Sequence, residues 1–193
     1  MKSLRKYWLR WNVDRAAGGD PAAMNRLYLF GDPWKLDSPG EHFRFQETAR
    51  IIREKIGQRF GSILEIGCGE GLQTGYLAAL ADRIVGLDPS AHAIKRASAR
   101  HIPNASFAVG DLDGCATKPD TRFDLVTACE VLYYMNDFEE ARENLNKVAR
   151  TCLVTYFKGA YERLDPCFAG ENFHSEIIKN AECEWKVVFW SQS

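Results

Sequence analysis

A glycine-rich turn follows a short apolar run in the first half of the chain. In the segment SILEIGCGEG, Glu65 stands two residues before Gly67, and Gly69 and Gly71 follow at alternate positions. Glycine permits both a tight turn from a strand into a helix and a close approach of the backbone to a ligand. The turn alone does not separate these two alternatives, so the acidic residues that come after it decide which chemistry it serves.

Three acidic residues stand at the ends of later apolar runs. Asp88 ends RIVGLD, about 20 residues beyond the first glycine, where a carboxylate accepts hydrogen bonds from both hydroxyls of a ribose. Asp111 follows ASFAVG, in the right place to accept from an adenine amino group, and Glu130 ends RFDLVTACE. A helix cap formed by Asp88 or Ser90 is the alternative use of the LDPS segment. The turn and the three acids together indicate a nucleoside ligand.

The elements that would position these residues alternate between strand and helix. Apolar runs predict strands at 62–67, 83–88, 105–111, 122–130, 151–157 and 184–190, and periodic patterns predict helices at 42–60, 72–81, 89–100 and 137–149. This alternation is typical of a doubly wound, mostly parallel α/β sheet, in which ligands bind beyond the carboxyl ends of the strands. We expect a helical lid segment over residues 1–40 and a single cofactor-binding domain over residues 41–193.

The end of the chain departs from this pattern. Only EWKVVFW follows the fifth predicted strand, so the C-terminal strand pair is expected to be incomplete, or residues 182–190 to take a neighbouring place in the sheet. In that case Trp185, Phe189 and Trp190 would cover an exposed edge or join a partner chain, which leaves monomer and homodimer both open.

Composition limits the classes of partner. The 193 residues carry a formal charge of -1, which argues against a bulk electrostatic grip on nucleic acid. The six cysteines form no CxxC pair, so we expect no metal site and no disulfide framework, but reduced thiols in the cytoplasm. No apolar run approaches the roughly 20 residues that span a bilayer. The basic, aromatic start MKSLRKYWLRW suits either weak contact with an anionic membrane surface or polyanion, or a packing helix with solvated arginines.

The order and spacing of LEIGCGEG, GLDPS, VGDL and FDLVTACEVLYYM strongly resemble the successive motifs of class I S-adenosylmethionine-dependent methyltransferases, which have a Rossmann-like fold. The resemblance implies that Glu65 orients the turn and faces the methionine ammonium, that Asp88 holds the ribose, and that Asp111 holds the adenine amino group. The cofactor-binding residues that it implies are Glu65, Gly67, Cys68, Gly69, Asp88, Pro89, Asp111, Leu112, Glu130, Val131 and Trp34.

The acidic character of these motifs favours this cofactor over a nicotinamide dinucleotide. S-adenosylmethionine carries a sulfonium and an ammonium cation and no pyrophosphate, whereas a dinucleotide needs backbone N–H groups at a helix N-terminus for its phosphates. We expect Glu70, close to the start of the following helix, to repel a phosphate.

A second set of residues restricts the range of possible methyl acceptors. There is no Asn-Pro-Pro-Tyr or Asp-Pro-Pro-Tyr tetrapeptide of the kind that marks methylation of nucleic acid bases. The segment LYLFGDPWKLDSPGEHFRFQETARII, together with EVLYYM, resembles the nodulation-factor N-methyltransferases, which methylate an amino sugar at the end of a chitooligosaccharide. The resemblance implies methyl transfer to an amine or hydroxyl of a small molecule or saccharide.

An acceptor amine or hydroxyl must lose a proton during transfer. Glu130 is the favoured base because it ends the fourth predicted strand, and Tyr133 and His174 are the other catalytic candidates. For Glu130, a cap or cofactor contact is the alternative, and His42 is expected to be a capping or surface residue. A protein that binds the nucleoside or a partner without turnover is the alternative function.

Overall fold

The computed structural model describes residue 15, residues 20–117 and residues 122–192. The basic N-terminal stretch discussed above lies outside the described residues, so its proposed helix and its surface contacts stay predictions. Within the described ranges, no helix is long and apolar enough to cross a membrane.

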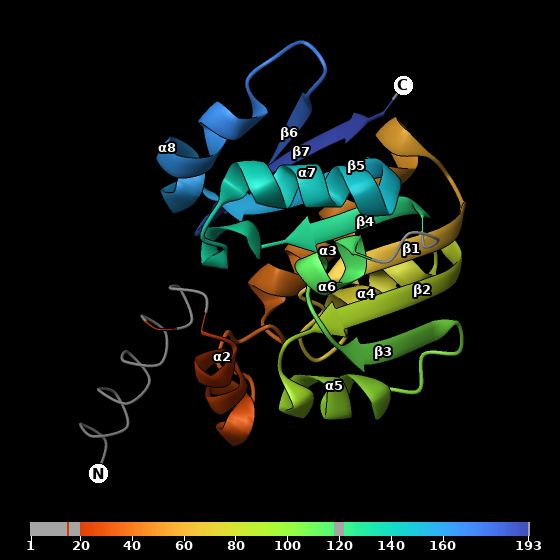
Figure 1. Cartoon of the computed structure of the whole chain (residues 1–193), viewed down its shortest axis with the longest axis vertical. Helices are drawn as coiled ribbons and strands as arrows, with labels where there is room; N and C mark the ends of the chain where they lie inside the picture. The colour runs from red at the N-terminus through yellow and green to blue at the C-terminus, as the bar shows by residue number, and fades with distance from the viewer. Residues whose placement is uncertain (1–14, 16–19, 118–121, 193) are drawn as a thin grey trace.

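The architecture is a seven-stranded sheet between two layers of helices (Figure 1). The strands lie in the order β3-β2-β1-β4-β5-β7-β6, and β7 is antiparallel to both of its neighbours while the first five strands are parallel. The strand bounds are β1 Phe60–Ile66, β2 Ala81–Asp88, β3 Ala105–Val109, β4 Phe123–Cys129, β5 Ala149–Phe157, β6 His174–Lys179 and β7 Glu184–Ser191. The predicted doubly wound, mostly parallel sheet is confirmed.

The helices follow the strands as predicted, with several short additions. The α-helices are α2 Pro21–Leu27, α3 Pro39–Ile51, α4 Leu72–Ala78, α5 Ala91–Ser98, α6 Leu112–Ala116, α7 Phe138–Val148 and α8 Tyr161–Leu164. A π-helical turn, η2, continues α3 over Ile52–Ile56, and 3₁₀ turns occupy η1 Tyr28–Phe30, η3 Leu132–Tyr134, η4 Lys158–Ala160 and η5 Asp165–Phe168. Side-chain caps begin α2 at Asp20, α3 at Ser38 and α7 at Asp137, where each accepts a backbone N–H of the first turn.

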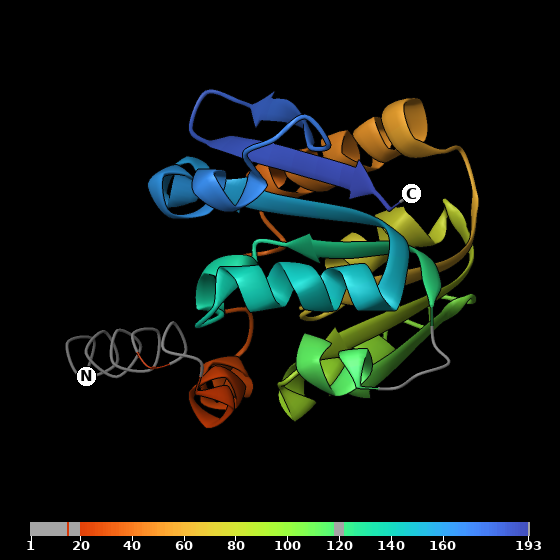
Figure 2. The same cartoon turned by 45° about the horizontal axis from the view of Figure 1, so that its top comes forward.

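Two apolar clusters hold the layers together. On one face of the sheet, α3 and α4 pack on side chains such as Ile63, Leu125 and Leu153. On the other face, α6 and α7 pack on the intervening positions of the same strands, such as Leu64 and Val126. Figure 2 shows the sheet between α3 and α7. Burial on both faces explains why these strands read as nearly continuous apolar runs.

The C-terminal strand pair is complete, and the expectation that it lacks a strand is wrong. The missing partner is β6, which forms the edge of the sheet and buries only Ile178 among its six residues. Because an edge strand covered on one side needs few apolar side chains, HSEIIK gives little signal in the sequence. β7 is therefore an interior strand, and Trp185, Phe189 and Trp190 are buried within this chain rather than covering an edge.

The order of the strands fixes where a ligand can lie. β1 is central, and the chain proceeds outward from it first through β2 and β3 and later through β4 and β5. At this switch point, the connection after β1 and the connection after β4 run to opposite faces of the sheet. They leave a crevice between them at the carboxyl ends of these two strands. The glycine turn follows β1, and Glu130 follows β4.

Candidate functional site

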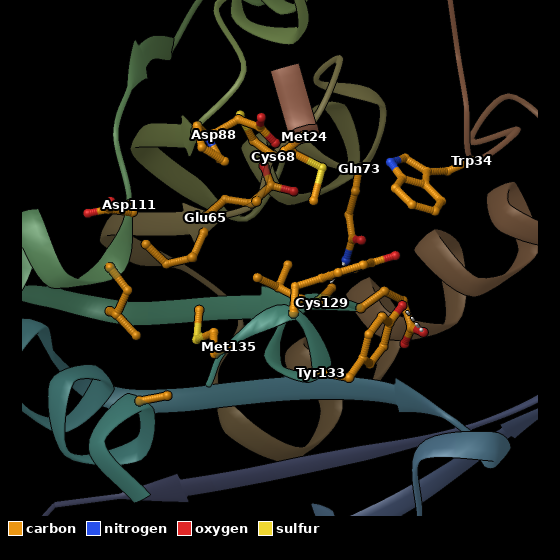
Figure 3. A pocket seen from close by; sticks show the side chains of 18 of the residues that line it. Met24, Trp34, Glu65, Cys68, Gln73, Asp88, Asp111, Cys129, Tyr133 and Met135 are labelled. Carbon is orange, nitrogen blue, oxygen red and sulfur yellow. Dashed lines mark hydrogen bonds between the residues drawn. The ribbon is translucent and has the colours of Figure 1, made fainter. Parts of the chain in front are cut away.

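A pocket of about 490 Å³ lies at the carboxyl ends of β1, β2 and β4. The pocket has two ends, as Figure 3 shows. One end is lined by Asp88, Asp111 and Met135, and the other by Gln73, Cys129, Tyr133 and Trp34; Glu65 lies between the two ends. Of the residues expected to bind a cofactor, the pocket is lined by Trp34, Glu65, Gly67, Cys68, Asp88, Pro89, Asp111, Leu112, Glu130 and Val131. The expected residues therefore converge on one cavity.

The glycine turn needs glycine for steric reasons. Gly67 and Gly69 have φ angles of 69° and 53°, a region that side chains of L-residues disfavour. A Cβ atom at Gly67 would collide with Cγ2 of Val131, and one at Gly69 would lie 3.0 Å from the hydroxyl of Tyr28. The tight connection therefore requires both glycines, and Gly67 also lines the pocket, whereas the close approach of the backbone to a ligand stays a prediction.

Asp88 joins the turn to the second strand. Its Oδ2 atom accepts from the Gly69 N–H at 3.0 Å, and its Oδ1 atom accepts from the Ser90 N–H at 2.8 Å. Ser90 caps α5 through its hydroxyl, so the cap and the pocket carboxylate are separate residues. Burial raises the pKa of Asp88 to about 6, although the two N–H bonds oppose the rise.

Gly69 does not line the pocket, and its N–H serves Asp88 instead. Glu70 also faces away, because its carboxylate pairs with Arg96 at 2.9 Å. The expectation that Glu70 repels phosphate therefore finds no support in the structure, and the preference for a cationic ligand depends on Glu65, Asp88 and Glu130.

Glu65 is a fully enclosed carboxyl at the centre of the pocket. It is 3% exposed and accepts a short hydrogen bond from the Thr74 hydroxyl on α4. Burial raises the pKa of Glu65 to about 7, and the Thr74 hydroxyl and the Arg44 guanidinium only partly offset this. A cation bound beside Glu65 would restore its charge.

Arg44 is a buried cation that sequence reasoning missed. On α3 it is 2% exposed, donates through Nε and Nη2 to the Glu41 carboxylate at 3.0 and 2.6 Å, and donates to Gln73 at 3.1 Å. Burial lowers the pKa of this guanidinium, but the Glu130 and Glu41 carboxylates outweigh that effect and raise it. A signal was present, because Arg44 precedes Thr48 and Ile52 at four-residue steps and so falls on the buried face of the helix.

Gln73 contacts both Arg44 and Cys129, the last residue of β4. Its Nε2 atom lies 3.1 Å from the Cys129 sulfur. Burial raises the pKa of Cys129 to about 12, so the thiol stays protonated. Cys129 is buried and also lines the pocket.

Glu130 has a strained backbone and a carboxylate that accepts three hydrogen bonds. Its φ angle of 59° is uncommon for a residue other than glycine, and such strain is concentrated at functional sites. Oε1 accepts from the Thr155 hydroxyl at 2.9 Å, and Oε2 accepts from the Phe157 N–H at 3.1 Å and the Tyr133 hydroxyl at 3.3 Å. Burial raises the pKa of Glu130, and Arg44 is the main opposing influence.

Aromatic rings enclose the end of the pocket beside Glu130. Trp34 lies 5.6 Å from Tyr134, which lies 4.7 Å from Tyr133, measured between ring centroids. Burial and the neighbouring Glu130 carboxylate raise the pKa of Tyr133 far above its usual value. Tyr133 therefore stays a neutral phenol that donates to Glu130, which disfavours it as a base.

The segment before α3 forms one wall of the pocket through Met24, Tyr28, Trp34 and Leu36. Asn25 accepts from the Ser90 hydroxyl at 3.0 Å, and Arg96 donates to the Tyr28 carbonyl at 2.8 Å. Asp32 accepts from the backbone N–H groups of Trp34 and Asp37 and so shapes the loop that carries Trp34. The division at residue 40 stays a prediction, but residues 20–36 are part of the pocket wall.

The remaining candidates lie in different places. Asp111 is exposed, lines the pocket, and caps α6 by accepting from the Gly114 N–H at 2.8 Å. His42 connects Asp37 and Tyr76 at 2.7 and 2.8 Å, outside the pocket lining. His174 lies on the edge strand β6, exposed and stacked on Phe189, so the structure does not bring it to the pocket.

Within the described part of the chain, no group of three or more His, Cys, Asp or Glu side chains could hold a metal ion.

The strand order and the antiparallel seventh strand define the Rossmann-like fold of class I methyltransferases, and acids at the carboxyl ends of β1, β2 and β4 line the pocket. The chain belongs to the nodulation protein S (NodS) family, whose profile matches residues 22–155.

Nodulation protein S of Rhizobium tropici is 32% identical to this chain over 130 residues, which cover 66% of this chain and 53% of that protein. Nodulation protein S of Bradyrhizobium diazoefficiens is 36% identical over 125 residues, 61% and 56% of the two chains. The chain thus spans about half the length of the curated relatives it matches. The crystal structure of the N-methyltransferase NodS from Bradyrhizobium japonicum WM9 in complex with S-adenosyl-L-homocysteine superposes with a TM-score of 0.70 at 22% identity, covering 91% of this chain and 98% of that one. This likeness shows the shared fold.

The steric account of the turn predicts that Gly67→Ala is destabilising. The left-handed φ angle and the collision with Val131 together should lower the free energy of unfolding by about 3 kcal/mol. Gly75→Ala is the matched control, because a Cβ in the middle of α4 meets no atom within 4 Å and should raise the free energy by about 0.5 kcal/mol. Denaturant unfolding measures both, and Val131→Ala should restore part of the loss in the Gly67→Ala background. Equal effects of the two glycine substitutions would contradict the account.

The burial of Glu65 predicts a pH-dependent gain in stability for Glu65→Gln. Since the pKa in the folded state, about 7, lies above the ordinary value of 4.5, ionisation of Glu65 destabilises the fold increasingly between these two pH values. The free energy of unfolding of the variant, relative to wild type, should therefore rise by about 2 kcal/mol between pH 5 and pH 8. Denaturant unfolding at each pH is the measurement, with the exposed Glu143→Gln as the control. A difference that does not change with pH would mean that Glu65 is not destabilised by burial.

Proposed function

We propose that this chain is an S-adenosylmethionine-dependent methyltransferase that transfers a methyl group to an amine or hydroxyl of a small molecule or saccharide. Membership of the NodS family and the class I fold support the proposal. The resemblance to nodulation-factor N-methyltransferases favours an amino sugar as the acceptor.

The observation that carries the proposal is the geometry of Asp88. Each of its oxygens already accepts one backbone N–H, and each keeps a further lone pair at the wall of the pocket. Two fixed acceptor oxygens, side by side at the end of the second strand, suit the two neighbouring hydroxyls of a ribose. Asp111 and Leu112, one strand further, would then contact the adenine.

The charges of the pocket suit the rest of the cofactor. Glu65 is central, desolvated and adjacent to the glycine turn, so an ammonium group placed there would gain a carboxylate partner and lower the pKa of that carboxyl. The sulfonium would lie toward Glu130 and the aromatic end, where the acceptor enters. Burial of these carboxylates strengthens their attraction for a cation, because little water screens them.

Methyl transfer is an in-line displacement at the sulfonium carbon, so alignment and exclusion of water are most of what the protein must supply. Trp34, Tyr133 and Tyr134 would shape the space for the acceptor. Glu130 is the proposed base: burial raises its affinity for a proton, and its carboxylate would attract an acceptor ammonium before deprotonation. Tyr133 would hold that carboxylate in place.

Calorimetric titration with S-adenosylmethionine tests the cofactor assignment. Asp88→Ala removes two charge-assisted acceptors and should weaken binding at least about 100-fold, whereas Asp82→Ala, at an exposed ion pair with Arg59, should leave the affinity unchanged. Wild-type affinity should also fall as the pH drops below about 6, because Asp88 becomes protonated. Circular dichroism confirms that each variant is folded.

Two outcomes would count against the function. Absence of binding to the folded wild-type protein would exclude the cofactor assignment. Tight binding without methylation of any amine or hydroxyl acceptor, as followed by mass spectrometry over an amino sugar series, would favour a nucleoside-binding protein with this fold.

A further inference from the structure

The aromatic wall of the pocket continues beyond the pocket itself. Trp34, Tyr134 and Tyr133 line the cavity, and the next ring is Phe157, whose centroid lies 5.3 Å from that of Tyr133 at an interplanar angle of 87°. Figure 3 shows Trp34 and Tyr133 at the same end of the cavity. Phe157 does not line the cavity, so the four rings form a continuous strip from inside the pocket to its outside.

Phe157 is both exposed and held in place. The residue is 44% exposed. Its N–H donates to the Glu130 carboxylate, and its ring packs so closely on Gly159 that a Cβ atom there would collide with it. The three other exposed large hydrophobic residues of the described ranges, Leu29, Val109 and Ile177, are aliphatic. Phe157 therefore offers a flat apolar face that loses little conformational freedom when something stacks on it.

Charged residues adjoin Phe157 along the chain and next to its partner Trp185 in β7. Lys158 follows Phe157 directly and pairs with Glu184 at 3.2 Å, and Lys179 pairs with the same carboxylate at 3.1 Å. A sugar ring has an apolar face of C–H groups and a rim of hydroxyls, so it complements an aromatic face bordered by charged side chains. The single ring, in direct continuation of the pocket, matches such a ligand better than the broad apolar area of a second protein chain.

We propose that Phe157 is a specificity-determining residue that stacks on the sugar unit next to the one that is methylated. The protein would then prefer an acceptor of two or more sugar units over a monosaccharide. The inference rests on the proposed function, since it requires the terminal sugar amine to lie in the pocket beside Glu130. Tyr133 lines the cavity and Phe157 lies outside it, so a sugar unit stacked on Phe157 would lie outside the cavity, where a longer oligosaccharide can extend into solvent.

The test compares methyl transfer to glucosamine with transfer to chitooligosaccharides that carry a free amine on the terminal unit. The readout is the ratio of kcat/KM for the oligosaccharide to kcat/KM for the monosaccharide. Phe157→Ala should lower this ratio roughly 5-fold, the usual effect of one lost aromatic contact. Phe157→Trp should retain it, and Ile177→Ala, at an exposed apolar residue of the edge strand, should leave it unchanged. All of these variants keep the backbone N–H that Glu130 accepts.

Each other outcome overturns the proposal in a recognisable way. A ratio that Phe157→Ala does not change would mean that the ring has no contact with a second sugar. Loss of a dimer on sedimentation of Phe157→Ala would assign the ring to an interface between copies of this chain. Wild-type transfer that is equally fast for all chain lengths would reject the proposal alone, whereas absence of transfer to any sugar would reject the proposed saccharide substrate as well.

Discussion

The site depends on the carboxylate of Asp88, which is buried at the end of the second strand and held by two backbone N–H groups. One of these belongs to the glycine turn after β1 and the other to the start of α5, so a single side chain fixes three segments around the crevice. Its environment raises its pKa because few charges compensate the burial. A desolvated carboxylate of this kind gains most from a ligand that brings hydrogen-bond donors to it. The geometry thus favours a ligand with two adjacent hydroxyls.

A buried cation balances the other acids of the pocket. Arg44 contacts Glu41 and Gln73 directly, and its charge opposes the rise in pKa of both Glu65 and Glu130. One guanidinium faces three carboxyl groups whose ionisation burial opposes, so a sulfonium and an ammonium bound in the cavity would favour their charged forms. Because a charge removed from a buried pair leaves its partner uncompensated, Arg44 is expected to matter for folding as well as for the pocket.

Much of the fold and of the pocket around Asp88 follows from the sequence. Strands β1, β4 and β5 are largely buried on both faces, so they appear as apolar runs, and Glu65, Asp88 and Glu130 mark the carboxyl ends of β1, β2 and β4. The edge strand β6 escaped prediction because only Ile178 is buried there. The roles of Arg44 and Phe157 were also not predicted. Arg44 contacts Gln73, which lies on another helix, and Phe157 packs on Gly159 beyond the end of β5, so both contacts depend on the tertiary structure. For the same reason His174 seemed close to the site, whereas the register of β6 puts it at the edge of the sheet.

The most direct test of this account is a crystal structure of the protein with S-adenosylhomocysteine. The account predicts that the ribose hydroxyls lie within hydrogen-bond distance of both Asp88 oxygens, that the adenine lies beside Asp111, and that the sulfur points toward Glu130 and the aromatic strip. A nucleoside bound in the reverse direction, with its sulfur at the Asp111 end, or bound without contact to Asp88, would contradict it.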